Sequence, residues 1–308
     1  MKQENTASEK AKNYGLLIVG AILLIAGIAF AIYTYNSSYQ NSVVTGTQLK
    51  EAKAQLSAIT EGTASGDTEA LKAEITRLSD EKLSLERPYS YSLTLVFFAI
   101  LLTAKGIYNA LIGVPKREKY DVKRLAQAGL LAALCYIGFA FFKIDIPVGP
   151  EKASFHFGNV FCVLAALLIG GYWGGMAGAV GMTIGDFTTS YVTSAPKTFL
   201  LKLCIGFIVG LVAHIFFKLS RDHSAKYVTG VTILASACGM AFNVVADPLV
   251  GYFYKTYLFG VPQDITSALM KISALTTSVN AVVAVIAASA IYLALRPALK
   301  KSGLFVEP

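Results

Sequence analysis

The chain has 308 residues, of which 55% are hydrophobic and only 15% are charged, against about 25% charged residues in an ordinary soluble domain. Its formal net charge is +8, yet residues 36–88 carry six basic and eight acidic residues, so the positive excess lies among the apolar runs. This composition excludes a soluble enzyme or a nucleic-acid-binding protein and predicts an all-α membrane protein with about eight transmembrane helices.

The first apolar run follows a polar stretch at residues 1–12 and contains 21 uncharged residues, from Gly15 to Tyr35. A secretory signal is an alternative, because Ala29-Phe30-Ala31 has the form of a cleavage site. The run, however, exceeds the usual signal core of about 7–15 residues and continues past that site. We therefore expect an uncleaved transmembrane helix at 13–36 and a cytoplasmic tail before it.

Residues 37–88 are much more polar, and their apolar residues recur at helical spacing in two stretches. Between the stretches, residues 62–67 are turn formers, with Asp67 a candidate N-cap. This pattern predicts an extracellular antiparallel helical hairpin that stands on two transmembrane helices. The two stripes that would pack against each other are Leu49, Ala52, Leu56 and Ile59, and Leu71, Ile75, Leu78 and Leu85.

The rest of the chain is a series of apolar runs separated by short loops. A second span is expected at 89–113, followed by a basic linker at 114–124, which the positive-inside rule places in the cytoplasm. A six-helix membrane domain would then occupy 125–296 and a cytoplasmic tail 297–308. Its expected spans are 125–142, 158–171, 175–192, 198–217, 228–251 and 270–295, the second being short enough to be re-entrant.

The basic residues of the later loops support one orientation of this domain. Lys218, Arg221 and Lys226 fall on the same side as the linker, as do Arg296, Lys300 and Lys301. The loops near 143–157, 193–197 and 252–269 fall on the other side. Both termini are therefore predicted to be cytoplasmic, and the helical hairpin to be outside.

No motif for soluble catalysis is present: the chain has neither G-x-x-x-x-G-K-[ST] nor H-E-x-x-H, and His156, His214 and His223 are scattered. We expect no catalytic residues, metal or cofactor. The candidate substrate-binding residues are instead polar side chains within or beside the last six apolar runs, where they are costly unless they are functional. They are His156, Asn159, Asp186, Lys202, Asn243, Asp247 and Asn280.

Most of these residues also have a structural interpretation, and His156 could be a loop residue that never meets a ligand. Asp186 and Lys202 could form an ion pair, Asn243 and Asn280 could bond helix to helix, and Asp247 could cap a helix broken at Pro248. Four tyrosines near the outer surface fit an interfacial aromatic belt, although one or two of them could stack on a flat ligand. These are Tyr191, Tyr252, Tyr254 and Tyr257.

Several segments together resemble the substrate-binding S components of energy-coupling factor (ECF) vitamin transporters over about residues 120–296. The resemblance rests on the Ala-rich run with Ala128 and Ala132 and on F-H-F-G-N-V-F at 155–161. It also rests on the glycine-rich turn at 170–175, on Gly185-Asp186, and on S-A-P-K-T-F at 194–199 leading into Lys202.

The resemblance implies a prokaryotic plasma-membrane subunit that captures a vitamin-like small molecule from outside, with pyridoxine or hydroxymethylpyrimidine as the favoured kind of ring. It also implies a membrane-embedded coupling subunit that contacts Ala128 and Ala132, two ATPase subunits, and a lid at 144–157. The two additional N-terminal spans depart from the family. Two alternatives are an ion-driven secondary carrier and a membrane sensor or assembly protein that acts through the extracellular hairpin.

Overall fold

The computed structural model describes residues 2–112, 122–148 and 151–305, with side chains from Tyr14 onward in the first helix. The chain divides into an N-terminal unit, residues 1–119, and a C-terminal unit, residues 120–308, and each is considered by itself. Most of the basic linker predicted at 114–124 lies outside the described residues, which omit residues 113–121.

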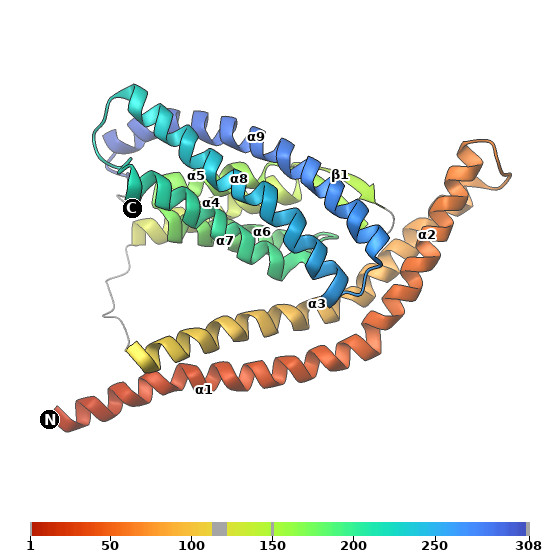
Figure 1. Cartoon of the computed structure of the whole chain (residues 1–308), viewed down its shortest axis with the longest axis horizontal. Helices are drawn as coiled ribbons and strands as arrows, with labels where there is room; N and C mark the ends of the chain where they lie inside the picture. Colours follow the sequence, from red (N-terminus) through yellow and green to blue (C-terminus); the bar gives the residue numbers. More distant parts are fainter. Residues whose placement is uncertain (1, 113–121, 149–150, 306–308) are drawn as a thin grey trace. The chain divides into compact units, whose positions relative to one another are not determined.

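The N-terminal unit consists of long antiparallel helices (Figure 1). Helix α1 (Lys2–Thr34) continues through a π-helical turn, η1 (Tyr35–Tyr39), into α2 (Gln40–Thr60), and α3 (Thr68–Ile112) returns alongside them. The reversal uses Gly62 at φ 74°, and the Asp67 carboxylate accepts hydrogen bonds from the Glu69 and Ala70 amides at 2.9 and 3.1 Å. The predicted N-cap at Asp67 is confirmed.

Close packing and a small core hold these helices together. A Cβ atom on Gly106 would lie 2.5 Å from the Leu17 Cα, and one on Gly20 would lie 2.7 Å from the Thr103 hydroxyl, so α1 and α3 approach through glycine. Beyond the apolar run, the buried Leu49, Ala52 and Leu78 form a cluster with Leu71 and Ile75. Five of the eight residues in the two predicted stripes therefore meet in this cluster.

The C-terminal unit is a helical bundle with one small sheet, a two-stranded antiparallel hairpin in the loop predicted near 143–157. Among the described residues this hairpin is the one departure from an all-α fold, and the alternation of Ile144, Ile146 and Val148 with polar residues or Pro147 explains it. The elements are α4 (Val122–Ala140), β1 (Lys143–Val148), β2 (Glu151–His156), α5 (Gly158–Ile169), α6 (Gly171–Thr188), η2 (Val192–Ser194), α7 (Ala195–Gly210), η3 (Leu211–Phe216), α8 (Ala225–Leu258) and α9 (Gln263–Lys301).

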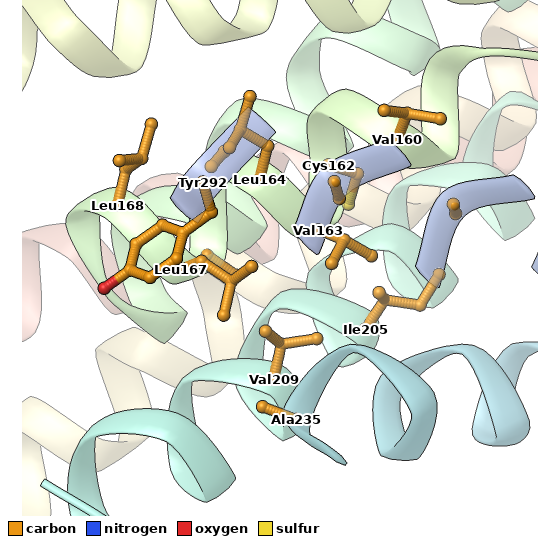
Figure 2. Close-up of a cluster of buried hydrophobic side chains, with 14 of the residues drawn as sticks. Val160, Cys162, Val163, Leu164, Leu167, Leu168, Ile205, Val209, Ala235 and Tyr292 are labelled. Carbon is orange, nitrogen blue, oxygen red and sulfur yellow. The ribbon is translucent and has the colours of Figure 1, made fainter. Parts of the chain in front are cut away.

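Helix α5 forms the centre of this bundle. Every one of its 12 residues except Phe161 is buried, and its side chains pack against Ile205, Val209, Ala235 and Tyr292 from three other helices (Figure 2). Twelve residues extend about 18 Å, much less than a hydrocarbon core of about 30 Å. The segment predicted as a short span is thus an apolar helix enclosed by its neighbours.

Six helical segments among the described residues are long and apolar enough to cross a membrane. Two lie in the N-terminal unit, and the others contain α4, α7, α8 and α9. Helices α5 and α6 fall outside this group, the first by its length. Both are packed tightly, because a Cβ on Gly174 would lie 2.3 Å from the Ala166 backbone and one on Gly206 would lie 2.1 Å from Gly175. The chain is an all-α, multi-pass membrane protein.

Candidate functional site

One cavity in the C-terminal unit collects all seven predicted substrate-binding residues. It is bordered by β2 and by helices α4 to α9, with a volume of about 110 Å³. His156 comes from β2, Asn159 from α5, Asp186 from α6, Lys202 from α7, Asn243 and Asp247 from α8, and Asn280 from α9. Asn159 lies at the start of α5 and Asp186 near the end of α6, whereas the residues from α7, α8 and α9 lie within those helices.

Both carboxylate oxygens of Asp247 are bonded to other side chains of the protein. One carboxylate oxygen forms an ion pair with Lys197 at 3.0 Å. The other accepts hydrogen bonds from the hydroxyls of Ser273 at 3.0 Å and Thr277 at 3.3 Å. Asp247 therefore ties α8 to α7 and α9, and its charge is neutralised within the protein.

Asn280 is likewise engaged, but with the β-hairpin. Its Oδ1 accepts a hydrogen bond from the His156 backbone N–H at 3.0 Å, and its Nδ2 donates to the Ser154 carbonyl at 3.1 Å. The structural interpretation of Asn280 as a bonding residue thus describes its contacts, although its partner is a strand.

Four other residues keep polar groups available to the cavity. In the part of the chain that the structure describes, the buried atoms His156 Nδ1, Asn159 Oδ1 and Asp186 Oδ2 have no hydrogen-bond partner. Asn159 and Asp186 are each only 1% exposed. Buried polar atoms are normally paired, so three unpaired ones around a single cavity indicate a place where a ligand would supply the partners.

Lys202 adds a buried cation to this group. It is 5% exposed, and its ammonium donates one long hydrogen bond, 3.4 Å, to Asn243 Oδ1. Among the described residues it forms no ion pair with Asp186, so the pairing considered from the sequence is not found. A buried ammonium with a single weak bond has donors to spare.

Aromatic side chains border the same cavity. Tyr191, Tyr252 and Tyr254 line it, together with Phe139, whose ring packs edge-on against His156 at a centroid distance of 4.9 Å. Tyr257 is 74% exposed and is not among the lining residues. Flat ring faces are thus available beside the polar atoms.

The sequence interpretation missed several lining residues that a helical periodicity would have revealed. Ser273, Thr276 and Thr277 precede Asn280 at spacings of seven, four and three, which places all four on one face of α9. Gly251 and Lys255 follow Asp247 on one face of α8 in the same way. Lys152 and Ser154 carried no such signal, because no strand was predicted there.

The predicted coupling-subunit residues lie elsewhere, on α4. Ala128 is 8% exposed and belongs to the core. A Cβ on Gly181 would lie 2.1 Å from the Ala132 carbonyl oxygen, so this part of α4 packs directly against α6. Three other small residues of α4, Ala126, Gly129 and Ala133, are exposed, and a Cβ on Gly129 would meet nothing within 4 Å.

Metal binding has no support in the described ranges, where no three His, Cys, Asp or Glu side chains are grouped as a metal ion requires. His214 lies outside the lining of the cavity, with Nδ1 3.0 Å from the Ser220 hydroxyl and Nε2 3.1 Å from the Ala166 carbonyl. What the cavity offers a ligand is its unpaired polar atoms, the Lys202 ammonium and the aromatic side chains of its lining.

Comparison with known proteins gives one match. The family model described as ECF-type riboflavin transporter, S component, matches residues 119–297. No curated protein and no solved structure matches the chain. The matched range covers more than half of the chain and contains every residue that lines the cavity.

Proposed function

The chain belongs to the family of ECF-type riboflavin transporter S components, and we propose that its cavity captures a flat-ringed vitamin for an ATP-driven importer. The observation that supports this proposal most directly is the set of unpaired buried atoms on His156, Asn159 and Asp186 around one cavity. Lys202 faces the same space with donors to spare. We assign no catalytic step to these residues, because their arrangement is suited to holding a molecule.

The donor and acceptor pattern favours a ring whose edge carries both kinds of group. Asn159 Oδ1 and Asp186 Oδ2 offer acceptors, and Lys202 offers an ammonium donor. Riboflavin, which the description of the family names, has a ring edge with an N–H group between two carbonyl oxygens. Such an edge complements acceptors and a cation on one wall, while Phe139 and the three lining tyrosines supply contacts for the ring faces.

The size of the cavity supports a second candidate ligand. Its volume of about 110 Å³ is well below the roughly 300–1,000 Å³ of pockets that enclose drug-sized ligands. Riboflavin would enter only with displacement of the lining side chains or of the β-hairpin. A pyridoxine- or hydroxymethylpyrimidine-like ring also combines donors and acceptors, and it needs less displacement.

Ligand titration of the purified full chain distinguishes these candidates. Riboflavin fluorescence is expected to be quenched on binding, and excess pyridoxine or hydroxymethylpyrimidine is then added as competitor. Native mass spectrometry of the protein as purified checks for a ligand that was retained. Quenching that resists both competitors supports riboflavin, whereas tight binding of a small ring alone supports the second candidate. Binding of none of the three would refute the proposed function.

The proposed transport cycle also requires a coupling subunit and two ATPases, in the plasma membrane of a prokaryote with both termini in the cytoplasm. We place the coupling surface on the exposed small residues of α4, Ala126, Gly129 and Ala133, because Ala128 is buried in the core and Ala132 packs against Gly181 of α6. Small residues four apart allow a partner helix to approach closely.

Two bulky substitutions test this surface. Ala133→Trp is expected to abolish uptake while ligand binding is retained, whereas Ile286→Trp, on an exposed position of α9, leaves both unchanged. Loss of uptake in both variants would show a general effect of bulk. Uptake that persists in cells lacking the coupling module would favour an ion-driven carrier instead.

A further inference from the structure

The β-hairpin that borders the cavity needs support from other elements. A two-stranded hairpin by itself is marginally stable, and this one has six residues in each strand. Its second strand contributes Lys152, Ala153, Ser154 and His156 to the lining of the cavity. Whatever holds β2 in place therefore also determines whether the cavity is closed on this side.

Apart from its pairing with β1, the backbone of β2 forms two hydrogen bonds with a single side chain, Asn280. In the register of the hairpin, Ser154 pairs with Asp145 and His156 with Lys143, and the N–H and C=O groups of alternate residues point to the same edge of a strand. The Asn280 amide occupies that edge, donating to the Ser154 carbonyl and accepting from the His156 N–H. It thus replaces a neighbouring strand with one residue of α9.

The same position is connected to the ligand-facing atoms. His156 is held at its backbone by Asn280, while its imidazole Nδ1 is buried without a partner at the cavity. A ligand could bond to this imidazole at the cavity only while Asn280 holds the His156 backbone in its present position. Ligand contact and the Asn280 hydrogen bonds therefore favour the same closed arrangement.

We propose that Asn280 is a positioning residue that holds the β-hairpin closed, and that the ligand enters and leaves when its two hydrogen bonds to β2 break. A second attachment, the hydrogen bond from the Tyr191 hydroxyl to Asp145 at 2.9 Å, holds β1 in place. This inference rests on the proposed function for its ligand, but the hairpin attachment is measurable without one.

Amide hydrogen exchange in the unliganded full chain tests the attachment directly. Asn280→Ala removes both bonds, and Asn280→Asp removes the donor at nearly constant volume. Exchange of the β2 amides is expected to rise roughly tenfold or more in both variants, as expected for the loss of one or two hydrogen bonds, with α5 unchanged. Ser278→Ala is the matched control, because that hydroxyl bonds only within α9, to the Ala274 carbonyl at 2.7 Å.

Riboflavin is the probe for the second measurement. Its dissociation rate is expected to rise in parallel with hairpin exchange in the Asn280 variants and to stay unchanged in Ser278→Ala. Weaker binding with unaltered β2 exchange would overturn the inference, because Asn280 would then act by touching the ligand. Absence of riboflavin binding in the unaltered chain would count against the proposed ligand, while the exchange result would still decide the role of Asn280.

Discussion

The two units of this chain bury polar side chains for different ends. In the N-terminal unit, Lys82 and Glu86 form an ion pair at 2.6 Å with side chains only 13% and 10% exposed, and the Thr34 and Ser92 hydroxyls are 3.0 Å apart. Asn109 is the exception there, with Oδ1 unpaired among the described residues. In the described part of the C-terminal unit, some unpaired atoms, such as Thr183 Oγ1 and Tyr292 Oη, lie away from the cavity, but three of them gather at it.

The difference shows that buried polarity alone does not identify a binding site. A paired residue such as Glu86 stabilises the packing of helices, because its partner has already compensated for its desolvation. An unpaired oxygen such as Asp186 Oδ2 leaves that compensation to a ligand. The same distinction divides the cavity itself, where both carboxylate oxygens of Asp247 have protein partners and Asp186 Oδ2 has none among the described residues.

The largest expected effect tests the unpaired group. Lys202→Met should weaken ligand binding by about 100-fold or more, because a charged hydrogen bond and its donor are lost from a desolvated site. The thermal stability should not fall, since the substitution removes a buried charge that has no carboxylate partner. Isothermal titration and thermal unfolding measure the two quantities.

Asp186→Asn should behave similarly, and two exposed residues provide matched controls. Lys271→Met and Asp264→Asn make the same chemical changes outside the cavity and should alter neither binding nor stability. Equal losses of binding in the cavity variants and in the controls would indicate a change of net charge as the cause, and would refute the assignment of Lys202 and Asp186.

The next effect concerns the paired group of the cavity. Lys197→Met leaves the Asp247 carboxylate without its cation, and breaking a buried pair typically costs about 3–5 kcal/mol. The melting temperature should fall clearly, and the double variant Lys197→Met/Asp247→Leu should recover part of it. A single variant as stable as the unaltered chain would show that Asp247 is not a structural centre of the bundle.

The sequence predicted where polar residues gather, and the structure assigned their partners. All seven candidates border the cavity. They could be selected from the sequence because a polar residue within or beside an apolar segment is costly and therefore marks a candidate site. Their pairing depends on helix rotation and offset, which periodicity does not determine, so Asp247 pairs with Lys197 while Asp186 and Lys202 remain separate. Asn280 bonds to a strand that was predicted as a loop.

The proposed coupling surface, which stays a prediction, illustrates a second limit. The A-x-x-x-A spacing of Ala128 and Ala132 indicates that a helix can approach, without indicating which helix. In the structure α6 takes that position, with Gly181 against the Ala132 carbonyl, and the exposed small residues are one position away, at Gly129 and Ala133. A shift of one residue moves the predicted surface by about 100° around a helix.

A smaller effect is expected from the corresponding pair of the N-terminal unit. Lys82→Met removes the ion-pair partner of the buried Glu86 and should destabilise the helical hairpin by about 1–3 kcal/mol, the usual cost of an unsatisfied buried polar group. Riboflavin affinity should stay within about twofold, because every residue that lines the cavity belongs to the C-terminal unit. Altered affinity would show that the N-terminal unit takes part in binding.

The last prediction is a pH dependence of ligand release that arises from protonation of His156. Burial lowers the pKa of this imidazole from 6.5 to about 3, Lys202 and Lys143 add to the shift, and Asp247 and Asp145 oppose it. The closed hairpin thus holds a neutral imidazole, whereas an opened hairpin would expose one that protonates near its ordinary pKa of about 6.5. The closed hairpin is therefore most stable relative to the open one above about pH 6.5, and this stability decreases as the pH falls from there toward 3.

The dissociation rate of riboflavin should accordingly be constant from about pH 8 to pH 7 and rise below about pH 6.5, by at most tenfold per pH unit. His156→Gln should remove this dependence, since a glutamine does not titrate, while the absolute rate also changes through loss of the imidazole. A rate in the unaltered chain that stays flat down to about pH 5 would show that release does not expose His156. The hairpin would then not be the exit, even if the unpaired atoms of the cavity bind the ligand as proposed.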